Sequence, residues 1–221
     1  MSIAIMKRLT IICILGLGLF AVAGLYPSVV DAAPVAAAPL PQTSCSLPAT
    51  VTTANQLSDC ITAANAGSGG TITFGADIDL TTLTTSPLPQ ITSSIVVEGA
   101  GYAIDGGSSV QIFNIGGSGD LTVNQATLRN GFSSSGGGIS NLGTLTVTNS
   151  TISDNSASGF AGGIYNNNTL VVANSTFSGN SVNFSGAAIR SAGGTVTVTN
   201  STFSGNSANS AGGGIENLLN S

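Results

Sequence analysis

From residue 119 onward, short runs of alternating apolar and polar residues recur with a period of about 25 residues, within the range typical of repeat proteins. The segment 143–155 (GTLTVTNSTISDN) returns as 168–180 (NTLVVANSTFSGN) and as 194–206 (GTVTVTNSTFSGN), and 119–131 is a degenerate first copy. A second marker, two small residues followed by isoleucine, keeps the same period and ends at Ile139, Ile164, Ile189 and Ile215. Two markers in one register across four copies indicate a repeat architecture.

Each repeat carries strand signals and no helix signal, so it can bury its apolar side only against the next copy. We expect three short strands per repeat, with alternate residues facing the interior. The inward columns are Leu121, Leu145, Leu170 and Val196; Val123, Val147, Val172 and Val198; Leu128, Ile152, Phe177 and Phe203; and Ile139, Ile164, Ile189 and Ile215. The pattern predicts an all-β, single-stranded parallel β-helix (a solenoid) of about six coils stacked ~4.8 Å apart.

Two columns of asparagines accompany the apolar ones. They are Asn149, Asn174 and Asn200, and, further along each repeat, Asn155, Asn180 and Asn206. Stacked amides can hydrogen-bond along a solenoid axis as they do in fibrils, so both columns are predicted to form structural ladders. The paired glycines before the isoleucines are expected at corners that need a positive φ or a close backbone approach.

The segment 1–44 differs from the repeats. Residues 1–32 are typical of a secretory signal peptide, with Lys7 and Arg8 before an apolar run and a small-residue cleavage pattern ending at Ala32. An uncleaved membrane anchor is the alternative for this segment. Residues 33–44 are predicted to form a Pro/Ala-rich linker.

Residues 45–67 are predicted to cap the N-terminal end of the solenoid, with one short helix over 53–65. Thr53 can cap that helix, and Leu57, Ile61 and Ala64 share one of its faces. The β-helix is expected over 68–221. Its last coil stops before the strand that would follow, which predicts an incomplete C-terminal end able to self-associate.

Cys45 and Cys60 are the two cysteines left once the signal segment is removed. In an exported chain they are candidates for a disulfide that pins the cap, whereas a lipidated Cys45 is the alternative.

The charge content excludes several functions. Charged residues make up 6% of the chain, 4 basic against 9 acidic, and there is no histidine. A basic surface for nucleic acid is therefore not expected, nor are histidine acid–base chemistry, a histidine metal site or a cofactor.

The repeats resemble those of the bacterial exported β-helix proteins that include polymorphic outer membrane proteins and autotransporter passengers. Their Phe-x-x-Asn motif is matched at 177–180 and 203–206 and loosely at 152–155, and their Gly-Gly-Ala-Ile motif is approximated at 136–139, 161–164, 186–189 and 212–215. The resemblance covers residues 45–221. It implies a right-handed helix, export to the cell surface, outer membrane or medium, and adhesion or display. No membrane span is expected in the mature chain.

The first hypothesis is therefore a non-catalytic, exported adhesion or surface-display module whose ligand is a host, matrix or glycan component. The alternative is a polysaccharide-acting β-helix enzyme of the pectin lyase or hydrolase kind, for which Asp77, Asp79, Glu98 and Asp105 are the acids and Arg129 and Arg190 the only candidate bases. A further alternative is binding to ice or another crystal surface through the outward threonines of 144–148 and 195–199, although Asn124, Val171 and Ala173 interrupt those rows.

Overall fold

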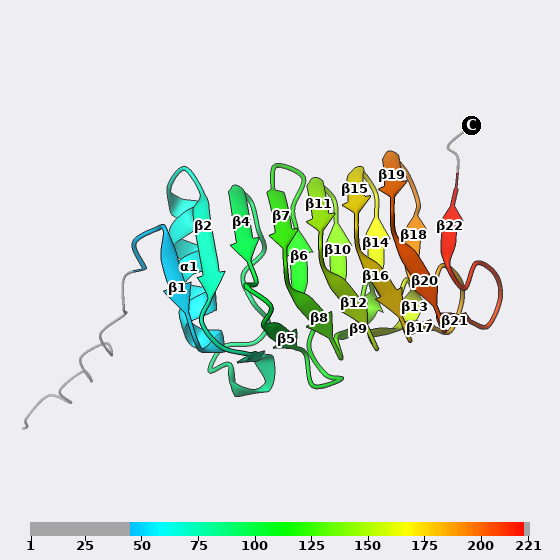
Figure 1. The fold of residues 1–221 in the computed structure, drawn as a ribbon, viewed down its shortest axis with the longest axis horizontal. Helices are drawn as coiled ribbons and strands as arrows, with labels where there is room; N and C mark the ends of the chain where they lie inside the picture. The colour runs from blue at the N-terminus through cyan, green and yellow to red at the C-terminus, as the bar shows by residue number, and fades with distance from the viewer. Residues whose placement is uncertain (1–44, 219–221) are drawn as a thin grey trace, which may run out of the picture. The chain divides into compact units, whose positions relative to one another are not determined.

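A computed structural model of the protein describes residues 45–218, which form a parallel β-helix with one α-helix at its N-terminal end (Figure 1). Every strand pairing within this range that joins successive coils is parallel, and each repeat pairs with its neighbours in the period that the sequence predicts. The predicted signal peptide, 1–32, and linker, 33–44, lie outside the described residues.

The strands fall into four parallel sheets, which we call A to D. Sheet A has seven strands and follows the order β1 (Ala49–Val51), β2 (Gly70–Phe74), β4 (Ser94–Glu98), β7 (Asp120–Asn124), β11 (Thr144–Thr148), β15 (Thr169–Ala173) and β19 (Thr195–Thr199). Sheet B has six strands, β3 (Ile78–Asp79), β5 (Ala103–Asp105), β8 (Thr127–Arg129), β12 (Thr151–Ser153), β16 (Thr176–Ser178) and β20 (Thr202–Ser204).

Sheets C and D complete each coil. Sheet C has five strands, β6 (Phe113–Ile115), β10 (Ile139–Asn141), β14 (Ile164–Asn166), β18 (Ile189–Ser191) and β22 (Ile215–Asn217). Sheet D has four, β9 (Phe132–Ser135), β13 (Ser156–Phe160), β17 (Ser181–Val182) and β21 (Ser207–Ala208). A full coil therefore has four strands, and the expected three is wrong because the strands of sheet D consist mostly of serine and alanine, which carry a weak strand signal, and have at most one β-branched or aromatic residue each.

The apolar columns form the core in the predicted register. Leu145 pairs with Leu170, Ile152 with Phe177 and Ile139 with Ile164, and all six side chains are fully buried. The Phe177 ring stacks on the Phe203 ring of the next coil, with centroids 4.9 Å apart. Ile215 in β22 is 41% exposed, since no described coil lies over it.

The paired glycines lie at the corner between sheets D and C. Gly136 has a φ of +67°, the left-handed conformation that favours glycine. A Cβ on Gly137 would collide with the carbonyl oxygens of Ser156 and Gly162 in the next coil, so this position needs glycine for close approach. Close approach is confirmed for the pair itself, whereas the positive φ lies one residue earlier, at Gly136.

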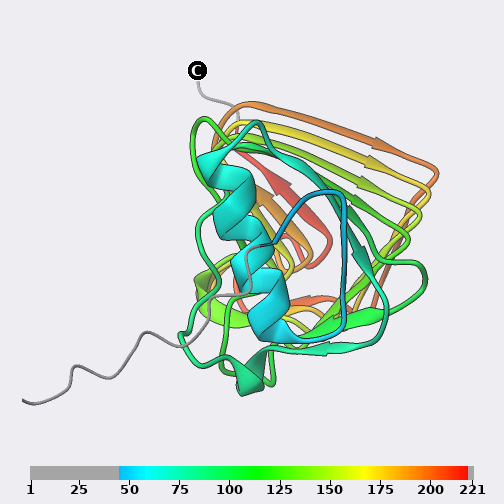
Figure 2. The same ribbon diagram turned by 90° about the vertical axis from the view of Figure 1, so that its left-hand side faces the viewer.

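The predicted cap helix is α1 (Ala54–Ala66), which crosses the N-terminal end of the coil stack (Figure 2). The Thr53 side chain accepts a hydrogen bond from the Gln56 N–H at its N-terminus. Leu57, Ile61 and Ala64 are buried against the first coils, and a short 3₁₀ helix, η1 (Leu80–Thr82), follows β3.

The cap segment also contributes a strand. β1 lies before α1 and pairs with β2, so sheet A has seven strands where about six coils were expected. A disulfide joins Cys45, just ahead of β1, to Cys60 on the buried side of α1.

Candidate functional site

The column of Asn155, Asn180 and Asn206, which we call the inner column, forms a continuous hydrogen-bond ladder. The Asn155 side-chain amide donates to Oδ1 of Asn180 at 3.0 Å, and the Asn180 amide donates to Oδ1 of Asn206 at 2.9 Å. Each amide also donates to a carbonyl of the preceding coil, as Asn180 does to Ile152 O at 2.9 Å. Asn155 and Asn180 are fully buried, so these amides serve the fold and are not accessible to a ligand.

A second buried ladder, which is not among the predicted asparagine columns, runs along sheet C. The Asn141 amide donates to Oδ1 of Asn166 at 2.7 Å, and the Asn166 amide donates to Oγ of Ser191 at 3.1 Å. The signal was present in the sequence, because a polar residue stands two places after each of the first three repeat isoleucines. A polar side chain at an inward strand position is buried, so it needs a hydrogen-bond partner.

The outer column, Asn149, Asn174 and Asn200, is not a ladder, and that prediction is wrong. These residues have positive φ values of 50°, 51° and 45° and their side chains are exposed. Among the described residues no hydrogen bond joins one of these amides to the next, and Asn149 instead donates to Oδ1 of Asn124 at 2.9 Å. Asparagine is used here because it tolerates the left-handed conformation at the corner between sheets A and B.

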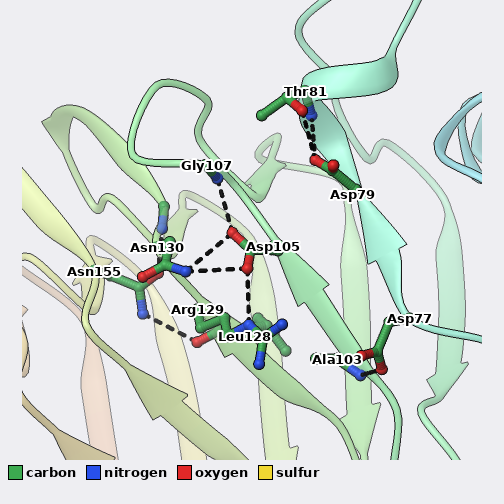
Figure 3. A network of polar contacts seen from close by, with 11 residues as sticks. Asp77, Asp79, Thr81, Ala103, Asp105, Gly107, Leu128, Arg129, Asn130 and Asn155 are labelled. Carbon is green, nitrogen blue, oxygen red and sulfur yellow. Dashed lines mark hydrogen bonds and ion pairs between the residues drawn. The ribbon is translucent and has the colours of Figure 1, made fainter.

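Four candidate catalytic residues meet at one shallow pocket on the outer face of sheet B (Figure 3). Asp77, Asp79, Asp105 and Arg129 line it together with Thr81 and Gly107. The register brings them together, because Asp79 pairs with Asp105 and Asp105 with Arg129 in successive coils. Asp77 and Asp79 are two residues apart, so the alternation of a strand predicts that they share a face. In the structure Asp105 and Arg129 lie beside them.

Each carboxylate in this pocket is engaged by the chain. Asp77 accepts from the Ala103 N–H at 2.8 Å, and Asp79 accepts from the N–H and hydroxyl of Thr81 at 2.9 and 2.7 Å. Asp105 accepts from the Gly107 N–H at 2.9 Å and from the Asn130 amide through both oxygens. Nε of Arg129 lies 2.8 Å from Oδ2 of Asp105, forming an ion pair.

The electrostatics of Asp105 oppose a role as general acid. Partial burial raises its pKa, but the hydrogen bonds from Gly107, Asn130 and Arg129 and the charge of Arg129 lower it by more, so the net pKa lies below its ordinary value. A glycosidase needs one carboxyl group with a raised pKa. The Arg129 guanidinium is engaged by the same carboxylate in an ion pair, so the base candidate at this pocket is already bound to one of its acids.

The other two candidate charged groups lie elsewhere. Glu98 accepts from the Asn124 amide at 2.7 Å on the outer face of sheet A. Nε of Arg190 lies 2.8 Å from Oε2 of Glu216 without the alignment of a hydrogen bond, and its guanidinium carbon lies 3.6 Å from the centroid of the Phe160 ring. The structure therefore does not join Glu98 or Arg190 to the pocket on sheet B.

The outward threonines of sheet A lie in adjacent rows. Thr144, Thr169 and Thr195 form a column without a break over three coils. In the next two columns β15 places Val171 between Thr146 and Thr197, and Ala173 between Thr148 and Thr199. A flat array of threonine hydroxyls is thus interrupted at its centre.

These features define a β-solenoid protein with polar ladders in its interior and small polar residues on its faces. Within residues 45–218 no group of three or more histidine, cysteine or acidic side chains is arranged to hold a metal ion, and no helix combines the length and apolar character needed to cross a bilayer. Comparisons of the chain with protein-family models, with curated proteins and with solved structures find no match.

Proposed function

We propose that the protein is a non-catalytic, exported β-helix module that presents a rigid surface for adhesion or display. The observation that carries this proposal is the state of the pocket on sheet B, where every acidic side chain is held by hydrogen bonds from the chain itself. Asp105 is bonded through both of its oxygens and would have to give up some of these bonds to take a proton from a substrate, while Asp77 and Asp79 each accept through Oδ1.

Three features of the chain support export. Residues 1–32 have the pattern of a secretory signal, and the repeats resemble those of exported surface proteins. The bond between Cys45 and Cys60 is of a kind that persists in oxidising compartments.

The repeat geometry supports a binding role. Parallel coils in register present the same face at each step of ~4.8 Å, so weak contacts to an extended ligand can add along the solenoid. The core that fixes this surface is continuous from Leu57 in the cap to Ile189 in sheet C.

The test is to apply the purified protein to arrays of cells, matrix proteins and glycans, and in parallel to measure reducing sugars and unsaturated products released from pectic and neutral polysaccharides. We expect retention on at least one surface and no product. Release of product by the wild-type protein would overturn the proposal, and so would the absence of binding throughout the arrays.

The alternative, a polysaccharide-acting enzyme, is favoured by one observation, the convergence of three carboxylates and Arg129 on the pocket of sheet B. If that pocket is catalytic, the Asp105→Asn and Arg129→Ala variants will abolish product release while a substitution on another face, such as Thr146→Ala, will not. If the protein is a binding module, neither the wild type nor any of these variants releases product.

A further inference from the structure

A second hollow lies on the outer face of sheet D, and none of the candidate catalytic acids or bases lines it. It is a groove of about 360 Å³ that crosses four successive coils. Its lining comprises Phe132, Ser156, Ala157, Ser158, Ser181, Val182, Asn183, Ser207 and Asn209. We call this the sheet D groove.

The sheet D groove has the repeat of the solenoid. Phe132 pairs with Ser156, Ser156 with Ser181 and Ser181 with Ser207, so one column along the axis starts with an aromatic ring and continues with three hydroxyls. Two positions further along each of the last three coils stand Ser158, Asn183 and Asn209. Successive coils are ~4.8 Å apart, which is close to the length of one sugar unit in an extended chain.

The polar side chains of the groove are uncommitted. No hydrogen bond joins the amides of Asn183 and Asn209, or the hydroxyls of the groove serines, to any other residue between 45 and 218. The asparagines inside the solenoid, by contrast, donate and accept several hydrogen bonds each. Amides and hydroxyls both donate and accept, which matches the mixed donor and acceptor character of sugar hydroxyls.

The absence of charge in the groove lining and the exposed ring of Phe132 narrow the class of ligand that the groove can bind. None of the residues that line the groove is charged, and the pocket on sheet B sets three carboxylates against one guanidinium, so neither hollow offers a positive surface to a polyanion. Phe132 is 41% exposed at the start of the column. An exposed ring beside a few polar groups is the usual composition of a ligand site, and its face can cover the apolar face of a pyranose.

We propose that the sheet D groove binds a neutral, extended oligosaccharide whose chain runs along the solenoid axis, with one sugar on Phe132 and the next sugars over the rows that contain Asn183 and Asn209. This inference rests on the proposed binding function and names its ligand class.

The test is calorimetric titration of the purified protein with neutral hexasaccharides of β-1,4-glucose, β-1,3-glucose and β-1,4-xylose, with hexagalacturonate as the anionic comparator. We expect binding of at least one neutral hexasaccharide, and at least tenfold weaker binding by Phe132→Ala and by the double variant Asn183→Ala/Asn209→Ala. The matched control is Tyr102→Ala, because Tyr102 is an aromatic residue of similar exposure, 39%, outside the groove.

The outcomes separate this inference from the function it rests on. Wild-type protein that binds cells, matrix or hexagalacturonate but no neutral hexasaccharide would overturn the groove assignment and leave the binding function standing. Neutral-sugar binding that both groove variants retain would also overturn it. Melting curves of the variants that match the wild type, as expected for exposed side chains, exclude unfolding as the cause of a loss.

Discussion

Asn155, Asn180 and Asn206 occupy the same turn in successive coils, and each side chain satisfies backbone groups that the turn leaves unpaired. Oδ1 of Asn180 accepts from the Asn155 N–H at 3.1 Å and from the Asn155 amide at 3.0 Å, while the Asn180 amide donates to Asn206 and to Ile152 O. A buried polar group is costly only when it lacks partners. The ladder therefore lets a polar residue stand in the core without leaving its amide unpaired.

At the residue scale, Asn180→Ala tests the ladder. The substitution leaves the Asn155 N–H, the Asn155 amide and Ile152 O without their partner, and each such loss costs about 1–3 kcal/mol. We expect the free energy of unfolding, measured by urea denaturation, to fall by at least that amount. Asn167→Ala is the matched control, since Asn167 is exposed and its side chain makes no hydrogen bond with a described residue. Equal stability of the two variants would refute the structural role of the ladder.

Asp105 gives a prediction for pH. Its pKa in the folded protein is lower than in the unfolded chain, so its charged form stabilises the fold fully above about pH 5, and this contribution is lost as the pH falls through the unfolded and then the folded pKa. In Asp105→Asn we expect a shallower decrease in melting temperature between about pH 5 and pH 2 than in the wild type. Parallel profiles would show that the network around Asp105 does not stabilise the folded state.

The outer asparagines show why residue roles were only partly predictable. Asn149 and Asn155 recur with the same spacing, so periodicity alone assigns both to ladders. The two asparagines differ in the direction of their side chains. Asn149 stands directly after an alternating strand, at a corner of positive φ, and its side chain is exposed, whereas the side chain of Asn155 is buried in the core. Asn-Ser directly after a strand is the local signal of such a corner.

At the scale of elements, the aromatic column joins neighbouring coils. Phe177 is fully buried between Ile152 and the stacked ring of Phe203. Phe177→Ala removes that contact and leaves a cavity, which costs about 3–5 kcal/mol for a buried phenylalanine. We expect a matching decrease in the free energy of unfolding by circular dichroism.

Phe132→Ala is the matched control for Phe177→Ala, since it deletes the same ring from an exposed position. If both substitutions lower stability equally, the column of Phe177 is not the core of the solenoid.

The cap is the second element whose contribution can be measured. The Cys45–Cys60 bond closes a loop with a sequence separation of 15, and constraining such a loop in the unfolded chain is worth about 3 kcal/mol. We expect the double variant Cys45→Ala/Cys60→Ala to unfold at lower denaturant than the oxidised wild type, and reductant to bring the wild type to the level of the variant. A reductant that leaves wild-type stability unchanged would contradict a stabilising bridge.

Elements were predictable where each coil repeats the same apolar residues. Sheets A, B and C follow from columns of leucine, valine, isoleucine and phenylalanine, and the Thr53 cap and apolar face of α1 follow from local signals. Sheet D was not predicted because its inward residues are mostly small, as in Ala157 and Ala208. β1 was missed as a strand because it lies before the helix and outside the repeats.

At the scale of the whole molecule, the pocket on sheet B and the sheet D groove both depend on the strand register between successive coils, which the repeat period alone does not fix. Asp79, Asp105 and Arg129 become neighbours because the first coils pair them at spacings close to the repeat period, but before residue 119 no repeat marker fixes which residues of successive coils align. The sheet D groove was missed for the same reason as sheet D itself. Chemistry on a solenoid face becomes visible only when successive coils are aligned.

The proposed binding role depends on export, and the Cys45–Cys60 disulfide is of a kind that persists in oxidising compartments. The most direct measurement is the intact mass of the protein recovered separately from the medium, the envelope and the cytoplasm of the producing cells, with and without thiol alkylation. We predict a product in the medium or envelope that lacks residues 1–32 and whose Cys45 and Cys60 resist alkylation until reduced. A product confined to the cytoplasm, with residues 1–32 retained and both thiols alkylated, would contradict the account.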